Sequence, residues 1–428
     1  SLGTQPVRDE DGVRCDLSER LLVPSASATL FRLGNPTLNT PSSFSCSATP
    51  GRGSAASPSF GILSTYPPTR CGLATFSAAL ADGLSLPGAE VSVVRVADGS
   101  SSISARVVGE LVSDSPASMA AASDLLNRSD VAIVQHEYGI YGGTDGDDVV
   151  DVIAGLRVPS IVVAHTVLKD PTPNQRSVLE AIAAMADQIV VMSNAASRRL
   201  CLGFDVDPQK VTTISHGAYV PPRLASSARQ GRPTLLTWGL LGPGKGIERV
   251  IDAMVSLHDL PAKPRYLVAG RTHPKVFAAE GETYRNARID QARHRGVAES
   301  VIFDADYRDV ASLTRLAQSS AVVVLPYDST DQVTSGVLVD AIATGRPVVA
   351  TAFPHAVELL GSGAGVVVDH DDPGALAEAL HRVLTQPDAA AAMAAEAARL
   401  APAMAWPIVA NAYLGVARSL LSEHSALV

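Results

Sequence analysis

The sequence predicts an α/β protein made of two doubly wound, Rossmann-like domains that face each other across a cleft. From Phe60 onward, short apolar runs alternate with alanine-rich helical stretches, a pattern typical of βαβ units and a parallel sheet. Pro221, Pro222 and residues 226–233 interrupt this alternation and read as a linker. At 428 residues the chain is also too long for a single hydrophobic core. Two domains account for all three observations.

The apolar runs predict two series of buried strands. In the first series we expect strands over residues 60–63, 91–96, 131–135, 160–164, 188–192 and 211–214. In the second series we expect strands over residues 234–238, 265–269, 301–303, 321–325, 348–350 and 365–368.

Changes in composition set the predicted domain limits. Residues 1–57 are rich in Ser, Thr, Pro and Gly and predict a flexible tail. Residues 58–225 and 226–400 then form the two Rossmann-like domains. The segment 401–428 contains a helix, at about 405–422, that we expect to pack back on the first domain.

Composition and charge exclude several classes of protein. The chain is 46% hydrophobic and 18% charged, with a formal net charge of -9, which argues against nucleic acid as the main partner and against a polybasic membrane anchor. No apolar run approaches the ~20 residues of a transmembrane helix, and the first residues do not resemble a signal peptide. The four cysteines show no CxxC spacing, so we expect reduced thiols and a cytoplasmic location.

Residues with reactive or flexible character follow successive predicted strands. Parallel sheets bind ligands beyond the carboxyl ends of their strands. A single histidine there is more often structural, but several such residues favour a shared ligand cleft. The histidines stand singly, without helical pairing, and we expect no metal site. The residues are His136, His165, Ser193, His216, Gly239 and Arg271.

The segment 330–350, TDQVTSGVLVDAIATGRPVVA, is the most informative part of the chain. Ser335 and Gly336 stand where a helix should begin, and unpaired amides with the positive end of the helix dipole attract anions. Asp340 lies four residues after Gly336, on the same helix face. The segment therefore predicts a phosphate site with a carboxylate beside it, although an ordinary helix start is the alternative.

Two further loops have the composition of ligand sites. Residues 239–246, GLLGPGKG, fit GxxxxGK, but a P-loop needs Ser or Thr where Gly246 stands, so a nucleoside triphosphatase is disfavoured. Lys245 remains well placed to neutralise a phosphate. Residues 136–143, HEYGIYGG, combine a histidine, a carboxylate and aromatic rings in a glycine-rich loop that suits sugar recognition. The loop ending at Gly72 offers helix-start amides or is a plain strand-to-helix turn.

From about residue 60 to its end the chain resembles the retaining glycosyltransferases of the GT-B fold, family four (glycosyl transferases group 1). Members carry two glutamates with seven residues between them, and here Gln332 and Asp340 occupy these positions. Their Gly-Arg-Leu loop with a downstream Lys-Gly is similar to residues 239–246, in which Leu240 replaces the arginine. These departures are compatible with a divergent active subfamily or with a catalytically silent copy, and we favour the former.

The resemblance implies roles for individual residues. His136, Gln332 and Lys245 would serve in catalysis, and Asp340 would bind the ribose of the nucleotide. The donor-binding set is Gly72, Gly239, Lys245, Arg271, Tyr307, Thr334, Ser335, Gly336, Val337 and Asp340. The acceptor-binding set is Tyr66, Glu137, Tyr138, His165, Asn174 and Gln175.

The implied reaction moves a hexose from a nucleoside diphosphate sugar, UDP- or GDP-linked, to an acceptor hydroxyl with retention of configuration. We expect no cofactor and no metal requirement. A non-catalytic nucleotide- or sugar-binding homologue, or a GT-B-like phosphorylase or epimerase, is the alternative. The sequence does not indicate the base, the acceptor or the oligomeric state.

Overall fold

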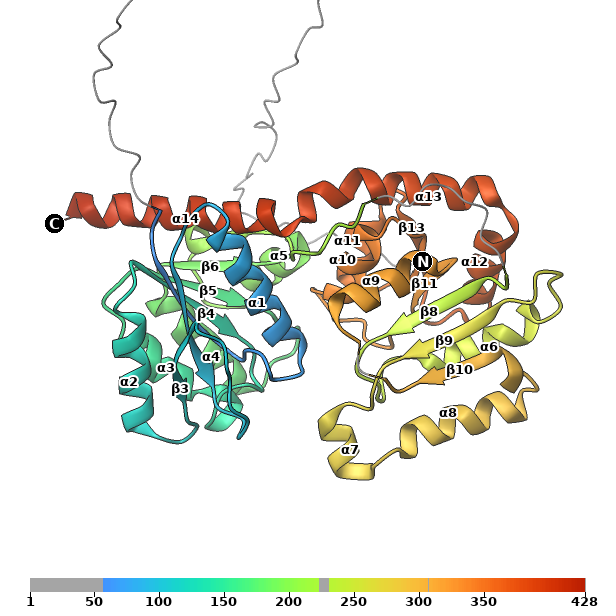
Figure 1. Ribbon diagram of the computed structural model, residues 1–428, viewed down its shortest axis with the longest axis horizontal. Helices are drawn as coiled ribbons and strands as arrows, with labels where there is room; N and C mark the ends of the chain where they lie inside the picture. The colour runs from blue at the N-terminus through green and yellow to red at the C-terminus, as the bar shows by residue number, and fades with distance from the viewer. Residues whose placement is uncertain (1–56, 223–230, 307, 428) are drawn as a thin grey trace, which may run out of the picture. The chain divides into compact units, whose positions relative to one another are not determined.

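The computed structural model describes residues 57–222, 231–306 and 308–427 (Figure 1). The predicted tail therefore lies outside the described residues except for Ser57, as do residues 226–230 of the predicted linker.

The first half of the described chain forms a seven-stranded parallel sheet in the order β3-β2-β1-β4-β5-β6-β7. The order reverses between β1 and β4, which is where doubly wound sheets bind ligands. Its strands are β1 (Phe60–Ser64), β2 (Val91–Val96), β3 (Val107–Leu111), β4 (Val131–His136), β5 (Ser160–Ala164), β6 (Gln188–Val191) and β7 (Val211–Thr213). Its helices are α1 (Gly72–Ser85), α2 (Pro116–Leu126), α3 (Asp148–Ala154), α4 (Pro173–Met185) and α5 (Asn194–Gly203).

The second half forms a six-stranded parallel sheet in the order β10-β9-β8-β11-β12-β13, with the same kind of reversal between β8 and β11. The predicted fold class of two doubly wound α/β sheets is therefore confirmed. The strands are β8 (Thr234–Trp238), β9 (Arg265–Ala269), β10 (Val301–Asp304), β11 (Val322–Leu325), β12 (Val348–Thr351) and β13 (Gly365–Val368). The helices are α6 (Ile247–Leu257), α7 (Pro274–Glu280), α8 (Thr283–His294), α9 (Val310–Ser319), α10 (Gly336–Ala343), α11 (Pro354–Leu360), α12 (Pro373–Thr385), α13 (Pro387–Leu400) and α14 (Trp406–Leu427).

Hydrophobic burial on both faces explains the continuous apolar strands. All five residues of β1 and of β8 are buried, as expected for strands covered by helices on each side. Each sheet has two separate clusters of buried side chains, one on each face. This arrangement leaves the carboxyl ends of the strands, and the loops that follow them, as the place for polar residues.

The chain returns to the first sheet through α14. This helix runs beside α1 in Figure 1, and Val409 and Tyr413 share a buried cluster with Phe76 and Leu80 of α1. A Cβ added at Gly83 would lie 2.8 Å from the Cβ of Ala410, so the two helices approach closely there. The last helix thus completes the core of the first sheet.

One strand escaped the sequence prediction. β3 is a short edge strand with alternating exposure, and its five residues, VVGEL, include a glycine and a glutamate. Such a segment lacks the continuous apolar run that identified its neighbours. The remaining predicted strands agree with the structure to within one residue at each end, and one shift places His136 inside β4 instead of after it.

Polar contacts join the strand-end loops of the first sheet to the segment before α10 and to α11. The Ser193 hydroxyl donates to the carbonyl of Val333 over 2.6 Å. The backbone amides of Asn194 and Ala195, at the start of α5, each donate over 2.8 Å to the carboxylate of Glu358. The carboxylate of Glu358 in α11, from the second half of the chain, therefore occupies the positive end of α5, from the first half.

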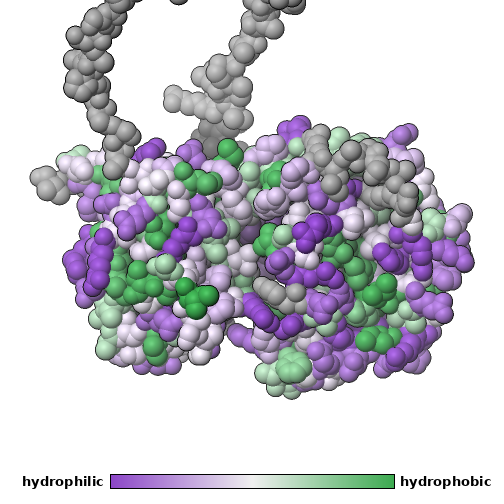
Figure 2. Space-filling view, in the orientation of Figure 1, coloured by the Kyte–Doolittle hydropathy of each residue, from purple (hydrophilic) through white to green (hydrophobic). Residues whose placement is uncertain are grey.

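Over the described residues, no helix is long and apolar enough to cross a membrane. Figure 2 shows polar and apolar residues interspersed over the visible face. Cys71 and Cys201 are free thiols, as expected, whereas Cys15 and Cys46 lie outside the described residues.

Candidate functional site

The predicted helix start in segment 330–350 is confirmed, because α10 begins at Gly336 with Ser335 as its N-cap. The Ser335 hydroxyl accepts a hydrogen bond from the amide of Leu338 over 3.3 Å. The amide of Ser335 itself donates to Nδ1 of His355 over 2.8 Å. Two side chains thus fix the backbone at this helix end, and burial lowers the pKa of His355 to about 4, which keeps its acceptor nitrogen unprotonated.

Gly336 lies directly against the imidazole of His216. A Cβ added at Gly336 would come within 2.8 Å of Nε2 of His216, so a side chain at this position would have to displace the imidazole. Nδ1 of His216 lies 2.7 Å from the carbonyl oxygen of Gly217 and therefore carries the proton, which leaves Nε2 as an acceptor. Burial lowers the pKa of His216 to about 4. A neutral histidine thus stands beside the helix start that the sequence assigns to phosphate.

Asp340 is exposed on α10, one turn beyond Gly336. The surrounding protein nevertheless desolvates its carboxylate and raises the pKa to about 7. A carboxylate at this position can accept hydrogen bonds from the hydroxyl groups of a ligand. Val337 is partly buried beside it.

Lys245 belongs to the loop between β8 and α6, and its ammonium nitrogen lies 4.6 Å from the ring centroid of Tyr327. Desolvation lowers the pKa of Lys245, and Tyr327 in turn hydrogen bonds with Ser335. The next residue, Gly246, has a φ of 64°, and a Cβ there would lie 1.7 Å from the carbonyl oxygen of Pro326. This close approach explains why the position cannot hold the Ser or Thr of a P-loop.

A cavity of about 280 Å³ brings together residues that the sequence placed in different groups. His165 was assigned to the acceptor, Gln332 to catalysis and Thr334 to the donor. Gln332 donates through Nε2 to the carbonyl of Thr334 over 2.9 Å, so its amide is held near the α10 start. The cavity is lined by His165, Thr166, Val167, Leu168, Ser329, Asp331, Gln332, Val333 and Thr334.

His136 ends β4 with its side chain fully buried, at 0% exposure. Both ring nitrogens lack a hydrogen-bond partner, and burial lowers the pKa to about 4. The ring of Tyr138 packs edge-on against it, with centroids 4.9 Å apart. Two unpaired buried nitrogens are uncommon in proteins. Because the ring is closed off from the surface in this conformation, the catalytic role assigned to His136 stays a prediction.

The remaining residues assigned to the acceptor differ in accessibility. Tyr66 and Tyr138 are 4% and 9% exposed. Glu137 accepts a short hydrogen bond from Thr166, and desolvation raises its pKa. The amide of Asn174 donates over 3.1 Å to the carbonyl of Thr144, and Gln175 completes a capping box at the start of α4. The last two side chains therefore already serve within the first sheet, and their contact with an acceptor stays a prediction.

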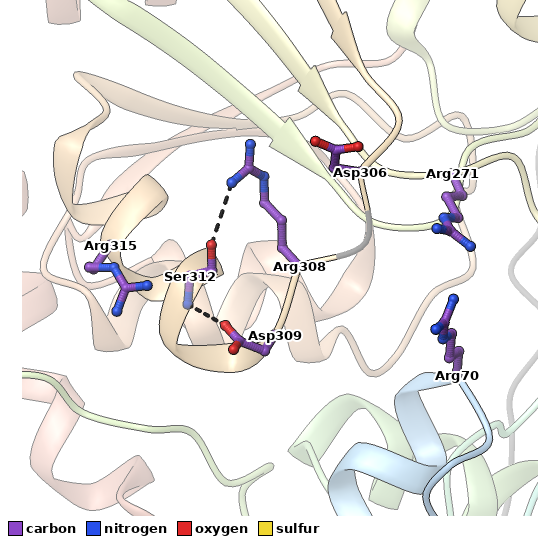
Figure 3. Close-up of a pocket in the computed structure, with 7 residues that line it drawn as sticks. All are labelled: Arg70, Arg271, Asp306, Arg308, Asp309, Ser312 and Arg315. Carbon is purple, nitrogen blue, oxygen red and sulfur yellow. Dashed lines mark hydrogen bonds between the residues drawn. The ribbon is translucent and has the colours of Figure 1, made fainter.

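A second and larger cavity, of about 540 Å³, gathers four arginines (Figure 3). Arg271, assigned to the donor, lies here and points toward Arg70. The sequence analysis missed the other three arginines, because an isolated surface arginine carries no local signal. Tyr307, also assigned to the donor, lies outside the described residues. The lining residues are Arg70, Arg271, Asp306, Arg308, Asp309, Ser312 and Arg315.

The two remaining glycines of the donor set are Gly72, at the start of a helix, and Gly239, at the end of a strand. Gly72 is the first residue of α1 and a Cβ there would meet nothing within 4 Å. Gly239 directly follows β8 with a φ of 124°. Among the described residues, no three His, Cys, Asp or Glu side chains are grouped so that they could hold a metal ion.

Residues 223–400 match the family model described as glycosyl transferases group 1. This part of the chain is similar to that family. The match covers β8 to α13 and so includes α10, Lys245 and Asp340.

Curated relatives extend the likeness toward the first sheet. The chain is 26% identical over 281 residues to D-inositol 3-phosphate glycosyltransferase of Corynebacterium efficiens, covering 60% of this chain and 64% of the relative. It is 28% identical over 303 residues to the protein of the same name from Kineococcus radiotolerans, covering 63% of this chain and 68% of that one. The matches thus span about two thirds of each relative's length.

Solved structures give the fold of both halves. Sucrose-phosphate synthase from Thermosynechococcus elongatus superposes with a TM-score of 0.69 at 17% identity, covering 86% of this chain and all of that one (100%). The Anabaena protein HepE, in complex with UDP and glucose, superposes with a TM-score of 0.66 at 16% identity, covering 85% and 100%. The predicted GT-B fold, with two Rossmann-like domains, is confirmed.

Proposed function

We propose that the protein is a retaining glycosyltransferase that moves a hexose from a nucleoside diphosphate sugar to an acceptor hydroxyl. The observation that carries the proposal is the start of α10, one turn before Asp340, where the N-cap Ser335 hydrogen bonds with Tyr327 and the desolvated ammonium group of Lys245 packs on the ring of Tyr327. The similarity of residues 223–400 to the glycosyl transferases group 1 family and the relatives' naming as glycosyltransferases support it.

The charges at this helix start suit a departing diphosphate. Amides at the positive end of α10 and the ammonium group of Lys245 would stabilise the negative charge that grows on the leaving group. The carboxylate of Asp340 would accept hydrogen bonds from the ribose hydroxyls. We further propose that no metal is required, because these groups supply the positive charge, and turnover that survives chelation with EDTA would check this.

The side chains around the smaller cavity would bind the transferred sugar. The side-chain amide of Gln332 can donate hydrogen bonds to sugar hydroxyls and accept hydrogen bonds from them. Gln332 lines this cavity together with His165 and Thr334. His136 would orient the sugar or shield the positive charge that develops on it. The anomeric configuration would be retained if the leaving phosphate itself assists deprotonation of the acceptor hydroxyl. A cytoplasmic location stays a prediction of the composition.

The first experiment measures release of UDP or GDP from the full chain supplied with UDP- or GDP-hexoses and a panel of hydroxyl acceptors. D-inositol 3-phosphate belongs in the panel because the relatives are named for it. We expect acceptor-dependent nucleotide release, with the anomeric configuration of the product read by NMR. An inverted product would overturn retention, and absence of any thermal shift with nucleoside diphosphates would overturn the donor site.

A non-catalytic nucleotide- or sugar-binding role is the second candidate, and Gln332 favours it because an amide replaces the family's carboxylate at that position. Binding of nucleoside diphosphates without transfer to any acceptor, in wild type and in Gln332→Glu alike, would support this role. Release of the nucleoside diphosphate that depends on inorganic phosphate instead of a hydroxyl acceptor would indicate a phosphorylase.

A further inference from the structure

A fully buried arginine lies behind the β1–α1 loop. Arg95 is the fifth residue of β2, is 0% exposed, and pairs in register with Ser64 of β1 and Glu110 of β3. Its guanidinium donates over 2.7 Å to the carboxylate of Glu110 and forms a short hydrogen bond to Asp98. Two carboxylates therefore face this buried cation.

Arg95 also donates over 2.7 Å to both the carbonyl and the hydroxyl of Ser100, in the loop after β2. Its two remaining hydrogen bonds hold the β1–α1 loop. Nε donates to the carbonyl of Tyr66 over 3.2 Å, and Nη2 donates to the hydroxyl of Thr69 over 2.9 Å. The Thr69 hydroxyl donates in turn to Asp98 over 2.7 Å. One planar guanidinium thus fixes both a backbone carbonyl and a side chain of the same loop, with donors held in a rigid fork that the rotating ammonium group of a lysine does not reproduce.

Burying this charge is not an efficient source of stability. The desolvation of a buried ion pair commonly cancels its Coulomb attraction, and apolar residues of similar volume serve as well or better. Desolvation would by itself raise the pKa of Asp98, but hydrogen bonds from Ser100, Thr69 and Arg95 hold it well below its usual range. Arg95 and Asp98 therefore form a charged pair whose hydrogen bonds have a fixed geometry, and such a pair is well suited to holding a loop in one conformation.

The loop held in this way leads to the functional site. It carries Arg70, which lines the larger cavity (Figure 3), and it ends at Gly72, where α1 begins. Displacing the backbone of residues 66–69 would move both groups. A misplacement of about 1 Å at an active site can reduce the rate about 100-fold.

We propose that Arg95, acting through Thr69 and Asp98, is a positioning residue that fixes the β1–α1 loop for glycosyl transfer. This role rests on the proposed function, because it assigns the loop to that reaction. Arg95 touches no substrate itself.

The test is Thr69→Val, which removes the loop's side-chain link to Arg95 while leaving the buried charges paired. We expect kcat/KM for transfer to fall at least about tenfold. Binding of UDP or GDP alone should change less than about threefold, because Lys245 and the α10 amides are untouched. Amide hydrogen exchange of residues 65–72 should accelerate, while the unfolding midpoint stays close to that of wild type.

Thr385→Val is the matched control, since Thr385 is an exposed threonine of α12 that bonds only within its own helix, to the carbonyl of His381 over 2.8 Å. It should leave transfer and loop exchange unchanged. Arg95→Lys should behave like Thr69→Val or worse, because an ammonium group cannot reproduce the fork. Unchanged transfer and exchange in Thr69→Val, or a loss matched by general destabilisation, would overturn the proposal.

The two proposals can fail separately. If wild type binds nucleoside diphosphates but transfers no sugar, the proposed function fails, and with it the positioning role in transfer. If wild type transfers sugar but Thr69→Val does so equally well, only the role of Arg95 fails.

Discussion

The starts of α1 and α10 are the same local motif in two different surroundings. Each helix begins with a glycine after a loop, and each is capped by a side chain, from Cys71 in α1 and Ser335 in α10. A Cβ at Gly336 collides with His216, whereas a Cβ at Gly72 meets nothing within 4 Å. The backbone at α10 is fixed by direct packing and the loop before α1 is fixed from behind, through Arg95. Similar sequence at two helix starts therefore does not imply similar rigidity.

Acidification should give the largest difference between the two halves. Burial lowers the pKa of His136, His165 and His216, at strand ends of the first sheet, to about 4, 3 and 4, and that of His355, in the second half, to about 4. These values lie below the unfolded pKa of about 6.5, so the unfolded chain binds protons first. Stability is therefore full above pH ~6.5 and declines toward pH ~4, by up to about 1.4 kcal/mol per pH unit for each histidine.

Denaturant unfolding at pH 7 and pH 5 measures this loss, and amide exchange corrected for intrinsic rates locates it. We expect amides of β4, β5 and α1 to lose more protection than those of β8 and β11. Asp340 should contribute to the pH dependence of stability with the opposite sign, because its pKa is raised to about 7 in the folded protein. Its exposure to solvent makes this contribution small. Equal losses in the two sheets would contradict the comparison.

Adding a methyl group at each helix start tests the difference directly. Gly336→Ala must displace His216 or the helix end, and we expect kcat/KM to fall about 100-fold. Gly72→Ala has room for the methyl group and keeps its amide, so a change below about threefold is expected. The double variant Gly336→Ala with His216→Ala should recover part of this loss in kcat/KM. An equally damaging Gly72→Ala would show that a ligand approaches both glycines closely.

Each helix start also has a cation near it, and the two should differ in strength. Lys245 is partly buried and desolvated, and Lys245→Ala should weaken donor binding about 30-fold, as expected for a charged hydrogen bond. Arg70 is exposed, so Arg70→Ala should weaken it no more than about fivefold. Isothermal titration with UDP and GDP measures both, and Lys245→Met controls for loss of the contact with Tyr327.

The smallest effect should come from the ionisation of Asp340. Because its pKa is raised to about 7, donor affinity should increase a few-fold as the pH rises from 6 to 8 and the carboxylate becomes able to accept ribose hydrogen bonds. Asp340→Asn should remove this dependence while unfolding stability near pH 7 is retained. A wild-type affinity that is flat across this range would separate Asp340 from the ribose.

Much of the fold could be predicted because the strands are buried on both faces and therefore continuously apolar. The start of α10 was predictable for a similar reason, since Ser335 and Gly336 are local helix signals. β3 was missed because an edge strand is half exposed. The contacts that organise the site could not be predicted, because they join residues far apart in the chain: His216 meets Gly336, and Arg95 gathers partners from two loops and a strand. No local pattern encodes such pairs.

The carboxylate of Glu358 on the α5 amides has a consequence for anion selectivity. A fold with many helix starts at the ends of its strands offers several places that attract phosphate. At α5 a phosphate would have to displace a carboxylate that the chain itself holds 2.8 Å from both amides. Such a tethered group acts at an effective concentration that a free metabolite rarely reaches. The carboxylate of Glu358 is thus a permanent competitor for any anion at the start of α5.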